Sequence, residues 1–511
     1  MSVLKNSKVI LTAILIFGIC LMIYHGYYKE YFYEDEVLSY TAANSQNGLW
    51  MNPSVGEWVS GDDLYSYIIV KPSERFDYDN VFANQVSDTH PPVYIAILHT
   101  ICSLIAGNWS KWTGIGLNIA CMVVVAILLY FLSLKFFPDK KELSLMYVFL
   151  WVCSIGTITQ VQYLRMYMVL QIFTTACALW HVNNINREEK KSDYAWLFLI
   201  TYFGTMTQYF YLINAFFFSV FFVLNRLYKK KIKSAVMYCV TMFVSAIVVL
   251  ITWPSIVSHM FIKEVGYGSF HHEISVSDII SRIHTMYVFV NNEVFGGVAK
   301  IIMLVIGAFM VYMLCTKKIN CPSFIKMSYS YWMLLGSSIL AFVTITLVTP
   351  YLCDRYISPL FAYILLFVLM ILFYMAEELF KSKYIGYAIV TVLFLCPEIG
   401  VLKEGLVDNN REIIMAESTE HSDSICLFQS NIPAEENVFE LNKFDDIYIY
   451  LHPKDIEDTR VKDADELVVY ISNDFDSDEI IREIQIINPK LKSSEQLYVA
   501  YYSRVYRLSS E

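Results

Sequence analysis

Long apolar segments recur along most of the chain and restrict its fold more than any other feature. Each has about the length that an α-helix needs to cross a bilayer. With 56% hydrophobic and 17% charged residues, the chain cannot be one soluble domain. We predict a polytopic helical membrane protein with eleven spans, at about 9–28, 112–134, 143–160, 166–183, 194–211, 212–228, 234–254, 298–316, 328–349, 356–376 and 384–402.

The first apolar segment predicts a transmembrane helix rather than a cleaved signal peptide. It lacks a small-residue cleavage site, and further apolar segments follow it. Most of the 11 cysteines lie within apolar segments and show no paired spacing. We interpret them as packing residues, which excludes a disulfide scaffold and a CxxC metal site.

Positive charges between the spans predict the orientation of the chain. Connections rich in Lys and Arg alternate with connections that hold few, which places the basic ones and the N-terminus in the cytoplasm. This alternation requires that the apolar stretch 91–107 lie at the outer face as an interfacial helix, because it is too short to cross. The loops 29–111 and 255–297 and the C-terminal tail are then extracytoplasmic.

The tail, residues 403–511, differs in composition from the transmembrane domain, residues 1–402. Its acidic residues outnumber its basic ones about two to one, which argues against nucleic acid as a partner. We predict a small α/β domain that serves in packing or acceptor docking, with a helix over 476–487. The predicted strands lie at 425–428, 446–451, 466–471 and 497–502.

Two short motifs carry the chemistry of the first loop. Glu34, Asp35 and Glu36 follow the first span, where desolvation and like-charge neighbours raise carboxyl pKa values and suit general-base work or metal ligation. Near the end of the loop, two prolines follow Asp88 and His90 and hold this acid and imidazole at the membrane surface. Taken singly, an acidic triplet is more often a solvated loop start. For the second motif alone, Asp88 as an N-cap and His90 as a surface residue is an equal alternative.

Together these motifs resemble the GT-C superfamily of membrane glycosyltransferases that use polyprenyl-phosphate sugars. The resemblance is strongest to the bacterial family 39 branch related to protein O-mannosyltransferases. Asp35-Glu36 matches the acidic pair that begins the first extracytoplasmic loop of that family, and 88–94 matches its Asp-x-His-Pro-Pro-x-Tyr segment. The similarity continues in 165–167, 207–211 and 354–359, although Gln208 departs from the pattern, where many relatives have His.

The resemblance implies transfer of a sugar from a polyprenyl-phosphate donor to a hydroxyl on a protein, polymer or glycolipid. The reaction is expected at the outer face of a bacterial plasma membrane, with inversion at the sugar. Asp35 is the implied general base, with Glu36 beside it as a catalytic residue. Asp88, His90 and Tyr94 are expected to form the acceptor side of the active site.

Donor phosphate binding is expected of Arg165, Tyr167, Arg355 and Tyr356. A guanidinium group is well matched to bidentate phosphate binding. For both arginines the alternative is anchoring at the membrane edge, and Arg355 has Asp354 as a further partner.

No cofactor is required by this reaction. A divalent cation that helps a leaving phosphate is left open, with Glu36, Asp88 and His90 as its expected ligands. His271 and His272 in the second long loop are a weaker ligand pair, because adjacent loop histidines are usually surface residues.

A transporter or flippase for a polyprenyl-linked glycan is the competing interpretation. Such proteins tend to place ionisable groups near the bilayer midplane, often within two related halves. The acidic residues of this chain cluster instead at one predicted face, and we find no internal repeat. A membrane-anchored scaffold would leave the carboxylate motifs unexplained, so the sequence favours the enzyme.

Overall fold

A computed structural model of the chain describes residues 7–138, 140–263, 275–316, 328–349, 351–380, 382–401, 411–500 and 502–510. The chain divides into two compact units. Unit 1 consists of Met1–Lys29, Thr89–Tyr94 and Lys111–Gly405. Unit 2 consists of Glu30–Asp88, Ile95–Ser110 and Leu406–Glu511.

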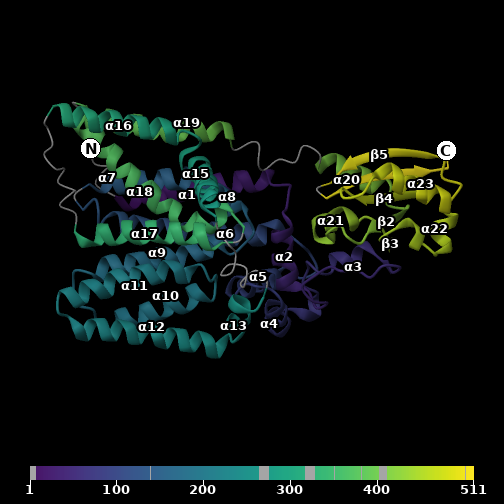
Figure 1. Cartoon of the computed structure of the whole chain (residues 1–511), viewed down its shortest axis with the longest axis horizontal. Coiled ribbons are helices and arrows are strands. Elements are labelled where there is room, and N and C mark those ends of the chain that lie inside the picture. The colour runs from purple at the N-terminus through teal and green to yellow at the C-terminus, as the bar shows by residue number, and fades with distance from the viewer. Residues whose placement is uncertain are drawn as a thin grey trace. The chain divides into compact units, whose positions relative to one another are not determined.

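Unit 1 is a bundle of long apolar helices (Figure 1). Among the described residues, six helices are long and apolar enough to cross a membrane singly, and up to eight spans result if each of two bent helix pairs is counted as one. The protein is therefore a multi-pass integral membrane protein, as predicted. The six helices are α1 (Ser7–Tyr28), α6 (Lys111–Ser133), α11 (Tyr211–Tyr228), α12 (Ile232–Thr252), α17 (Tyr329–Val348) and α18 (Asp354–Leu379).

The first bent pair interrupts the predicted span 143–160. Helices α7 (Lys141–Cys153) and α8 (Ile155–Gln162) meet at 52°. Between them, Ser154 Oγ accepts a hydrogen bond from the N–H of Thr157, 3.3 Å away. This N-cap satisfies a donor of the new helix and makes the break stable.

The second bent pair changes the interpretation of the predicted loop 255–297. That segment contains α13 (Ser255–Phe261) and α15 (Val276–Phe295), and α15 meets α16 (Ala299–Cys315) at 86°. Gly296 and Gly297 form the turn with φ values of 54° and 88°, a conformation that favours glycine. His271 and His272 lie outside the described residues.

Three further helices coincide with predicted spans but are not both long enough and apolar enough to cross a membrane singly. They are α9 (Tyr167–Asn184), α10 (Lys191–Thr205) and α19 (Lys383–Val401). The total of eleven spans therefore stays a prediction. Helices α9, α10, α11 and α12 pack side by side within unit 1 (Figure 1).

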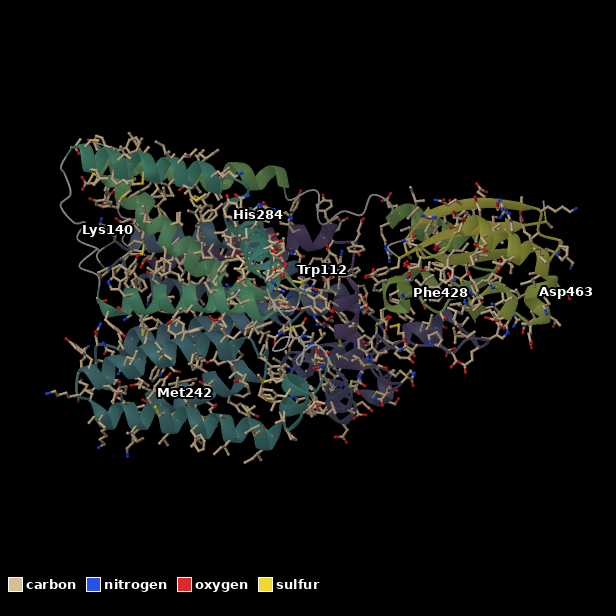
Figure 2. All side chains as sticks on the ribbon, viewed as in Figure 1. Trp112, Lys140, Met242, His284, Phe428 and Asp463 are labelled. Carbon is tan, nitrogen blue, oxygen red and sulfur yellow. The ribbon has the colours of Figure 1, made fainter. Side chains whose placement is uncertain are left out.

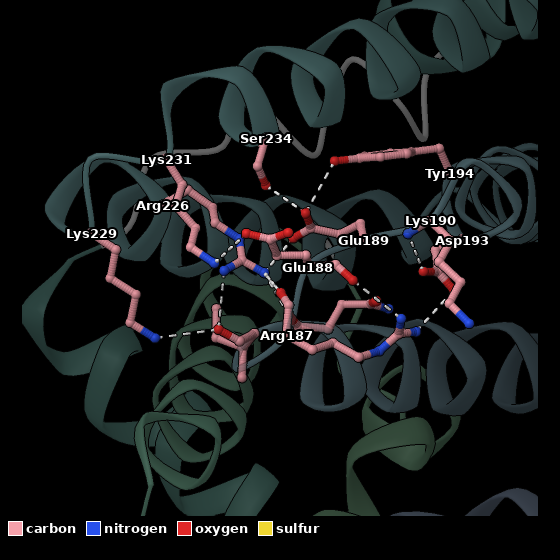
Figure 3. Close-up of polar contacts among 12 residues, drawn as sticks. Arg187, Glu188, Glu189, Lys190, Asp193, Tyr194, Arg226, Lys229, Lys231 and Ser234 are labelled. Atoms are coloured by element: carbon pink, nitrogen blue, oxygen red, sulfur yellow. Dashed lines mark hydrogen bonds and ion pairs between the residues drawn. The ribbon is translucent and has the colours of Figure 1, made fainter.

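A buried arginine joins these four helices at one end (Figure 3). Arg226 of α11 is fully buried and forms an ion pair with Glu189 in the connection between α9 and α10. Its guanidinium also donates to the carbonyls of Asn184 and Ile185, so a cation covers the C-terminal end of α9. Glu189 in turn accepts a hydrogen bond of 2.9 Å from Ser234 of α12. The two basic connections are thus held together by a network of hydrogen bonds and one buried ion pair.

Unit 2 contains a mixed six-stranded sheet with the order β1-β3-β2-β4-β6-β5. The central strands β3, β2 and β4 are parallel, and β6 and β5 continue the sheet antiparallel. The parallel strands are almost wholly buried, as expected of strands covered on both faces. The strands of the C-terminal segment are β2 (Ile425–Gln429), β3 (Ile447–Tyr450), β4 (Glu466–Ser472), β5 (Ser493–Val499) and β6 (Ser503–Ser509).

The C-terminal helices pack against this sheet and complete the predicted α/β domain. In Figure 2, the labelled Phe428 lies inside this domain and the labelled Asp463 at its edge, and Phe428 is only 1% exposed. The helix predicted over 476–487 is α23, and Asp476 is its N-cap. The helices are α20 (Arg411–Glu420), α21 (Ala434–Leu441), α22 (Thr459–Asp463) and α23 (Ser477–Ile487).

One strand prediction in this domain was wrong. The run 497–502 was predicted as a single strand, but β5 ends at Val499 and β6 begins at Ser503. Ala500 donates its N–H to the carbonyl of Ser503, which closes a hairpin between them. Aromatic and apolar residues continue through this turn, so their pattern did not mark its position.

The first loop contributes helices and a strand to unit 2. Its predicted interfacial helix corresponds to α5 (Val93–Leu104), of which residues 95–104 lie in this unit. Strand β1 (Trp58–Val59) pairs antiparallel with β3 and covers an edge of the sheet. The other helices of the loop are α2 (Glu34–Asn44), α3 (Gly61–Tyr65) and α4 (Tyr78–Ser87). The domain boundary after residue 402 stays a prediction.

Candidate active site

Asp35 and Glu36 lie in the first turn of α2, in unit 2. Acidic residues favour a helix start because the N-terminal end of a helix carries partial positive charge. Glu36 is fully buried, and its Oε2 accepts a hydrogen bond of 2.9 Å from the N–H of Tyr33, which fixes the start of the helix. Asp35 is only partly buried, so it is the carboxylate of this pair that meets solvent.

The C-terminal end of α2 is held by α4, which carries the second acidic motif. Asn84 of α4 donates a hydrogen bond of 2.9 Å to the carbonyl of Ser45, just after α2. Asp88 follows the last residue of α4 and accepts a hydrogen bond of 3.2 Å from Gln85. Asn84 and Asp88 are one helical turn apart. The packing of α4 on α2 therefore holds Asp88 in the same unit as Asp35 and Glu36.

The remainder of the second motif, Thr89–Tyr94, belongs to unit 1. Val93 donates its N–H to the carbonyl of Met206 at the end of α10, over 3.1 Å. Tyr94 is fully buried, whereas His90 is partly buried. Tyr94 therefore contributes to packing, and its predicted role at the acceptor side stays a prediction.

Arg355 and Tyr356 begin α18 in unit 1 and contact a tyrosine that precedes α9. The guanidinium of Arg355 donates a hydrogen bond to the hydroxyl of Tyr163 and lies 5.2 Å from the centre of its ring. The same guanidinium lies 5.9 Å from the ring centre of Tyr356. Ring faces attract a cation electrostatically, so the two tyrosines hold Arg355 in place.

Tyr167 completes this arrangement. Its ring stacks on Tyr163 with ring centres 6.1 Å apart and lies 6.4 Å from the ring of Tyr356. Three of the four residues predicted to bind donor phosphate are thus brought together. We name Tyr163, Tyr167, Arg355 and Tyr356 the arginine–tyrosine cluster.

Arg165, the fourth predicted residue, lies in the turn between α8 and α9. Its backbone N–H donates a hydrogen bond of 2.8 Å to the carbonyl of Tyr163. Its side chain is 6% exposed. A buried guanidinium is costly unless it meets acceptors, which suits a residue that faces an anion or a polar network.

Two residues of this region were missed in the sequence. Tyr163 stands two residues before Arg165 and shares its short polar segment, which was a usable signal. Glu293 is a carboxylate in the apolar helix α15 and accepts a hydrogen bond of 2.8 Å from Thr159 of α8. An ionisable residue within an apolar helix is a functional candidate by default.

An apolar cavity lies between α15, α17 and α18 in unit 1. It has a volume of about 400 Å³, and its lining includes Tyr287, Phe342 and Leu360. Leu360 follows Arg355 by five residues, which is about 7.5 Å along the axis of α18 and about 140° around it, so the two residues lie on different faces of this helix. Unit 1 thus contains both a fixed cation and an apolar cavity, on different faces of α18.

The predicted metal ligands are divided between the units. Glu36 and Asp88 belong to unit 2 and His90 to unit 1. Within the part of the chain that the structure describes, no group of three or more His, Cys, Asp or Glu residues is placed to hold a metal ion. A cation at Glu36, Asp88 and His90 stays a prediction.

The fold of the whole chain is similar to that of a known membrane protein. ArnT from Cupriavidus metallidurans bound to undecaprenyl phosphate matches with a TM-score of 0.55 and 9% sequence identity, over 98% of this chain and 97% of that chain. This likeness shows that the chain has an ArnT-like fold. No family model and no curated protein matches the sequence, so the family 39 branch stays a prediction.

Two further structures match less well. ArnT from Cupriavidus metallidurans in the apo state has a TM-score of 0.46 at 10% identity, over 92% of this chain and 96% of that chain. The archaeal oligosaccharyltransferase AglB from Archaeoglobus fulgidus, in complex with an inhibitory peptide and a dolichol-phosphate, has a TM-score of 0.42 at 7% identity, over 91% of this chain and 70% of that chain.

Proposed function

We propose that the chain is an integral membrane glycosyltransferase. It moves a sugar from a polyprenyl-phosphate donor to a hydroxyl acceptor at the outer face of a bacterial plasma membrane. The observation that carries this proposal is the arginine–tyrosine cluster in unit 1, which also contains an apolar cavity, in a chain with an ArnT-like fold. The ArnT structure contains undecaprenyl phosphate, a lipid that has a phosphate head and a long hydrocarbon chain, as the proposed donor does.

The proposed donor has an anionic head and a long hydrocarbon chain, and each part has a counterpart in unit 1. The guanidinium of Arg355 supplies charge-assisted hydrogen bonds for the phosphate, and its contacts with Tyr163 and Tyr356 reduce its freedom before binding. The cavity of about 400 Å³ has room for part of the isoprenoid chain. The isoprenoid chain needs no polar partner, so it can leave the bilayer lipid for an apolar lining without a desolvation penalty.

Asp35 is the proposed general base. It accepts the proton of the acceptor hydroxyl while the hydroxyl oxygen forms a bond to the anomeric carbon of the sugar. The bond between that carbon and the phosphate oxygen breaks, and polyprenyl phosphate leaves with the electron pair. A single displacement of this kind inverts the sugar configuration and forms no covalent glycosyl enzyme. General-base catalysis contributes about 10²- to 10⁴-fold in rate.

The other predicted residues receive supporting roles in this proposal. Glu36 fixes the start of α2 through its hydrogen bond from Tyr33 and so holds Asp35 in position. Asp88 and His90 serve the acceptor side. The N-terminus is cytoplasmic, and the C-terminal domain is extracytoplasmic, where the acceptor is met.

The test is release of sugar from a panel of polyprenyl-phosphate sugars by the purified chain in lipid, with candidate acceptors present. Turnover of one donor is expected, and its persistence in EDTA would show that no divalent cation is needed. If no donor turns over but a labelled polyprenyl-linked glycan crosses the bilayer of proteoliposomes, the flippase replaces the enzyme. Absence of both activities would leave the proposal contradicted for this donor class.

A further inference from the structure

Helix α21 of the C-terminal domain contacts the start of α2, the helix that carries Asp35. Glu436 accepts a hydrogen bond of 3.0 Å at Oε1 from the backbone N–H of Glu34, across 402 residues of sequence. Its Oε2 accepts a hydrogen bond of 3.4 Å from the hydroxyl of Tyr31. Glu34 is the first residue of α2, so its N–H is one of the donors that a helix start leaves without a partner in the helix.

Aromatic packing supports the same contact. The ring of Phe439 on α21 lies 5.4 Å from the ring of Phe32 and 4.6 Å from that of Trp109. Trp109 also lies 5.6 Å from the ring of Tyr40 on α2. Helix α21 therefore contacts the start of α2 through a polar cap and through tilted aromatic rings, all within unit 2.

The neighbouring carboxylates of α21 have other partners. Glu435 accepts a hydrogen bond of 2.8 Å from the N–H of Met51, and Glu440 forms an ion pair with Arg411 over 3.1 Å. Glu436 accepts the hydrogen bond from the backbone of α2, whereas Glu435 acts on Glu34 of α2 through its charge.

The cap has an electrostatic cost. Burial raises the pKa of Glu436 to about 7, and the charges of Glu34 and Glu440 add to the rise, while the N–H of Glu34 opposes it. Burial, Glu435 and Asp35 also raise the pKa of Glu34. An apolar side chain at this position would avoid this cost. A carboxylate that is buried among other carboxylates is locally unfavourable, and residues of this kind tend to mark functional sites.

We propose that Glu436 is a positioning residue, whose side-chain oxygen caps the first turn of α2 and so holds Asp35 in place for proton transfer. The catalytic part of this inference rests on the proposed function. Asp35 directly follows the capped residue, and fraying of the first turn would displace its carboxylate. Misplacement of a reacting group by about 1 Å can cost about 10²-fold in rate. The C-terminal domain then has a defined role in the activity of the whole chain.

Two substitutions distinguish the hydrogen bond accepted by the side chain of residue 436 from the volume that this side chain fills. Glu436→Gln keeps an oxygen that can accept the Glu34 N–H, and Glu436→Met removes the acceptor at similar size. Glu479→Met is the matched control, because Glu479 is likewise the third residue of its helix, α23, and is exposed. All variants are made in the full chain in lipid and are compared by hydrogen exchange and by transfer kinetics.

The expected results follow from loss of one N-cap. Amide exchange in peptides covering 31–37 rises about threefold to thirtyfold in Glu436→Met. The kcat of this variant falls by about tenfold or more, the KM for the donor is unchanged, and Glu436→Gln recovers most of the native kcat. Glu479→Met behaves as the native chain in both measurements.

Unchanged amide exchange at 31–37 in Glu436→Met would overturn the claim that Glu436 caps the first turn of α2. Equal loss of kcat in the Gln and Met variants, or a change confined to KM, overturns the positioning role. If the native chain transfers no sugar, the proposed function fails, and the cap is judged on exchange alone. Hydrogen exchange in the C-terminal strands identifies any variant whose sheet has unfolded. If Glu436→Met has unfolded, the exchange at 31–37 and the kcat of Glu436→Gln decide whether the proposal stands.

Discussion

The candidate sites of the two units differ in the charged groups that they contain. Unit 1 presents Arg165 and Arg355 among tyrosines at the ends of apolar helices, with the carboxylates of Asp354 and Glu293 nearby. Unit 2 presents carboxylates, with Asp35 on α2 and Glu436 beneath the start of that helix. The first arrangement suits an anion carried by an apolar chain, and the second suits acceptance of a proton. Under the proposed function, donor binding belongs to unit 1 and the general base to unit 2.

The first prediction isolates the base in unit 2. Asp35→Asn removes the proton acceptor with little change in size, so we expect kcat to fall by about 10²- to 10⁴-fold. Asp62→Asn is the control, because Asp62 is an exposed acid in the first turn of α3. Sugar release at saturating donor measures the effect. A native kcat in Asp35→Asn would remove this residue from the mechanism.

The second prediction concerns the cation in unit 1. Arg355→Ala removes a charge-assisted contact and should weaken binding of polyprenyl phosphate by about 10- to 100-fold. Arg355→Lys should recover part of this affinity, because it keeps the charge but loses the planar fork. Equilibrium binding of labelled polyprenyl phosphate is the measurement, with the exposed Arg187→Ala as control. Native affinity in Arg355→Ala would show that the cluster is an anchor at the membrane edge.

The third prediction concerns how unit 2 is held together. An added Cβ at Gly61 would lie 2.3 Å from the carbonyl oxygen of Leu441 and 2.7 Å from Cα of Asn442, which are backbone atoms. Gly61→Ala should therefore lower the free energy of unfolding of unit 2 by about 1–3 kcal/mol. Gly116→Ala, a helical position in unit 1 with open space, should have no such effect. Hydrogen exchange in β3 reports the difference, and unchanged exchange would show that the first loop does not pack on α21 as described.

The fourth prediction is a pH dependence specific to unit 2. The folded state raises the pKa of Glu436 from its ordinary value of 4.5 to about 7, so folding favours the protonated form. Its stabilising contribution is complete below the unfolded value and is lost as pH rises through about 7, with a slope of at most about 1.4 kcal/mol per pH unit. The unfolding temperature of unit 2 should therefore fall between pH 5 and 8. Glu436→Gln should show a smaller slope, and an unchanged slope would contradict the shift.

The membrane bundle was largely predictable because hydropathy acts locally. A helix in lipid satisfies its own backbone, so an apolar run of sufficient length indicates a span without knowledge of its neighbours. The pattern failed where a local polar residue or glycine redirects the chain. Ser154 breaks one predicted span, and Gly296 and Gly297 turn α15 away from α16.

The make-up of unit 2 was less predictable, because it depends on contacts between distant segments. The C-terminal strands and α23 follow from alternation and spacing within the tail. Pairing of Trp58 with Tyr448, and the hydrogen bond from Glu34 to Glu436, leave no periodic trace in the sequence. Tyr163 had a weak local signal in its position two residues before Arg165, but its contact with Arg355 of α18 is visible only in the fold.

The most direct test of the central claim measures donor binding and turnover together in Asp35→Asn and Arg355→Ala. The account predicts that Asp35→Asn binds polyprenyl-phosphate sugar with native affinity but transfers almost none of it, whereas Arg355→Ala binds the donor weakly. Equal loss of donor affinity in both variants, or transfer at the native rate by Asp35→Asn, would contradict the assignment of donor binding to unit 1 and of the base to unit 2.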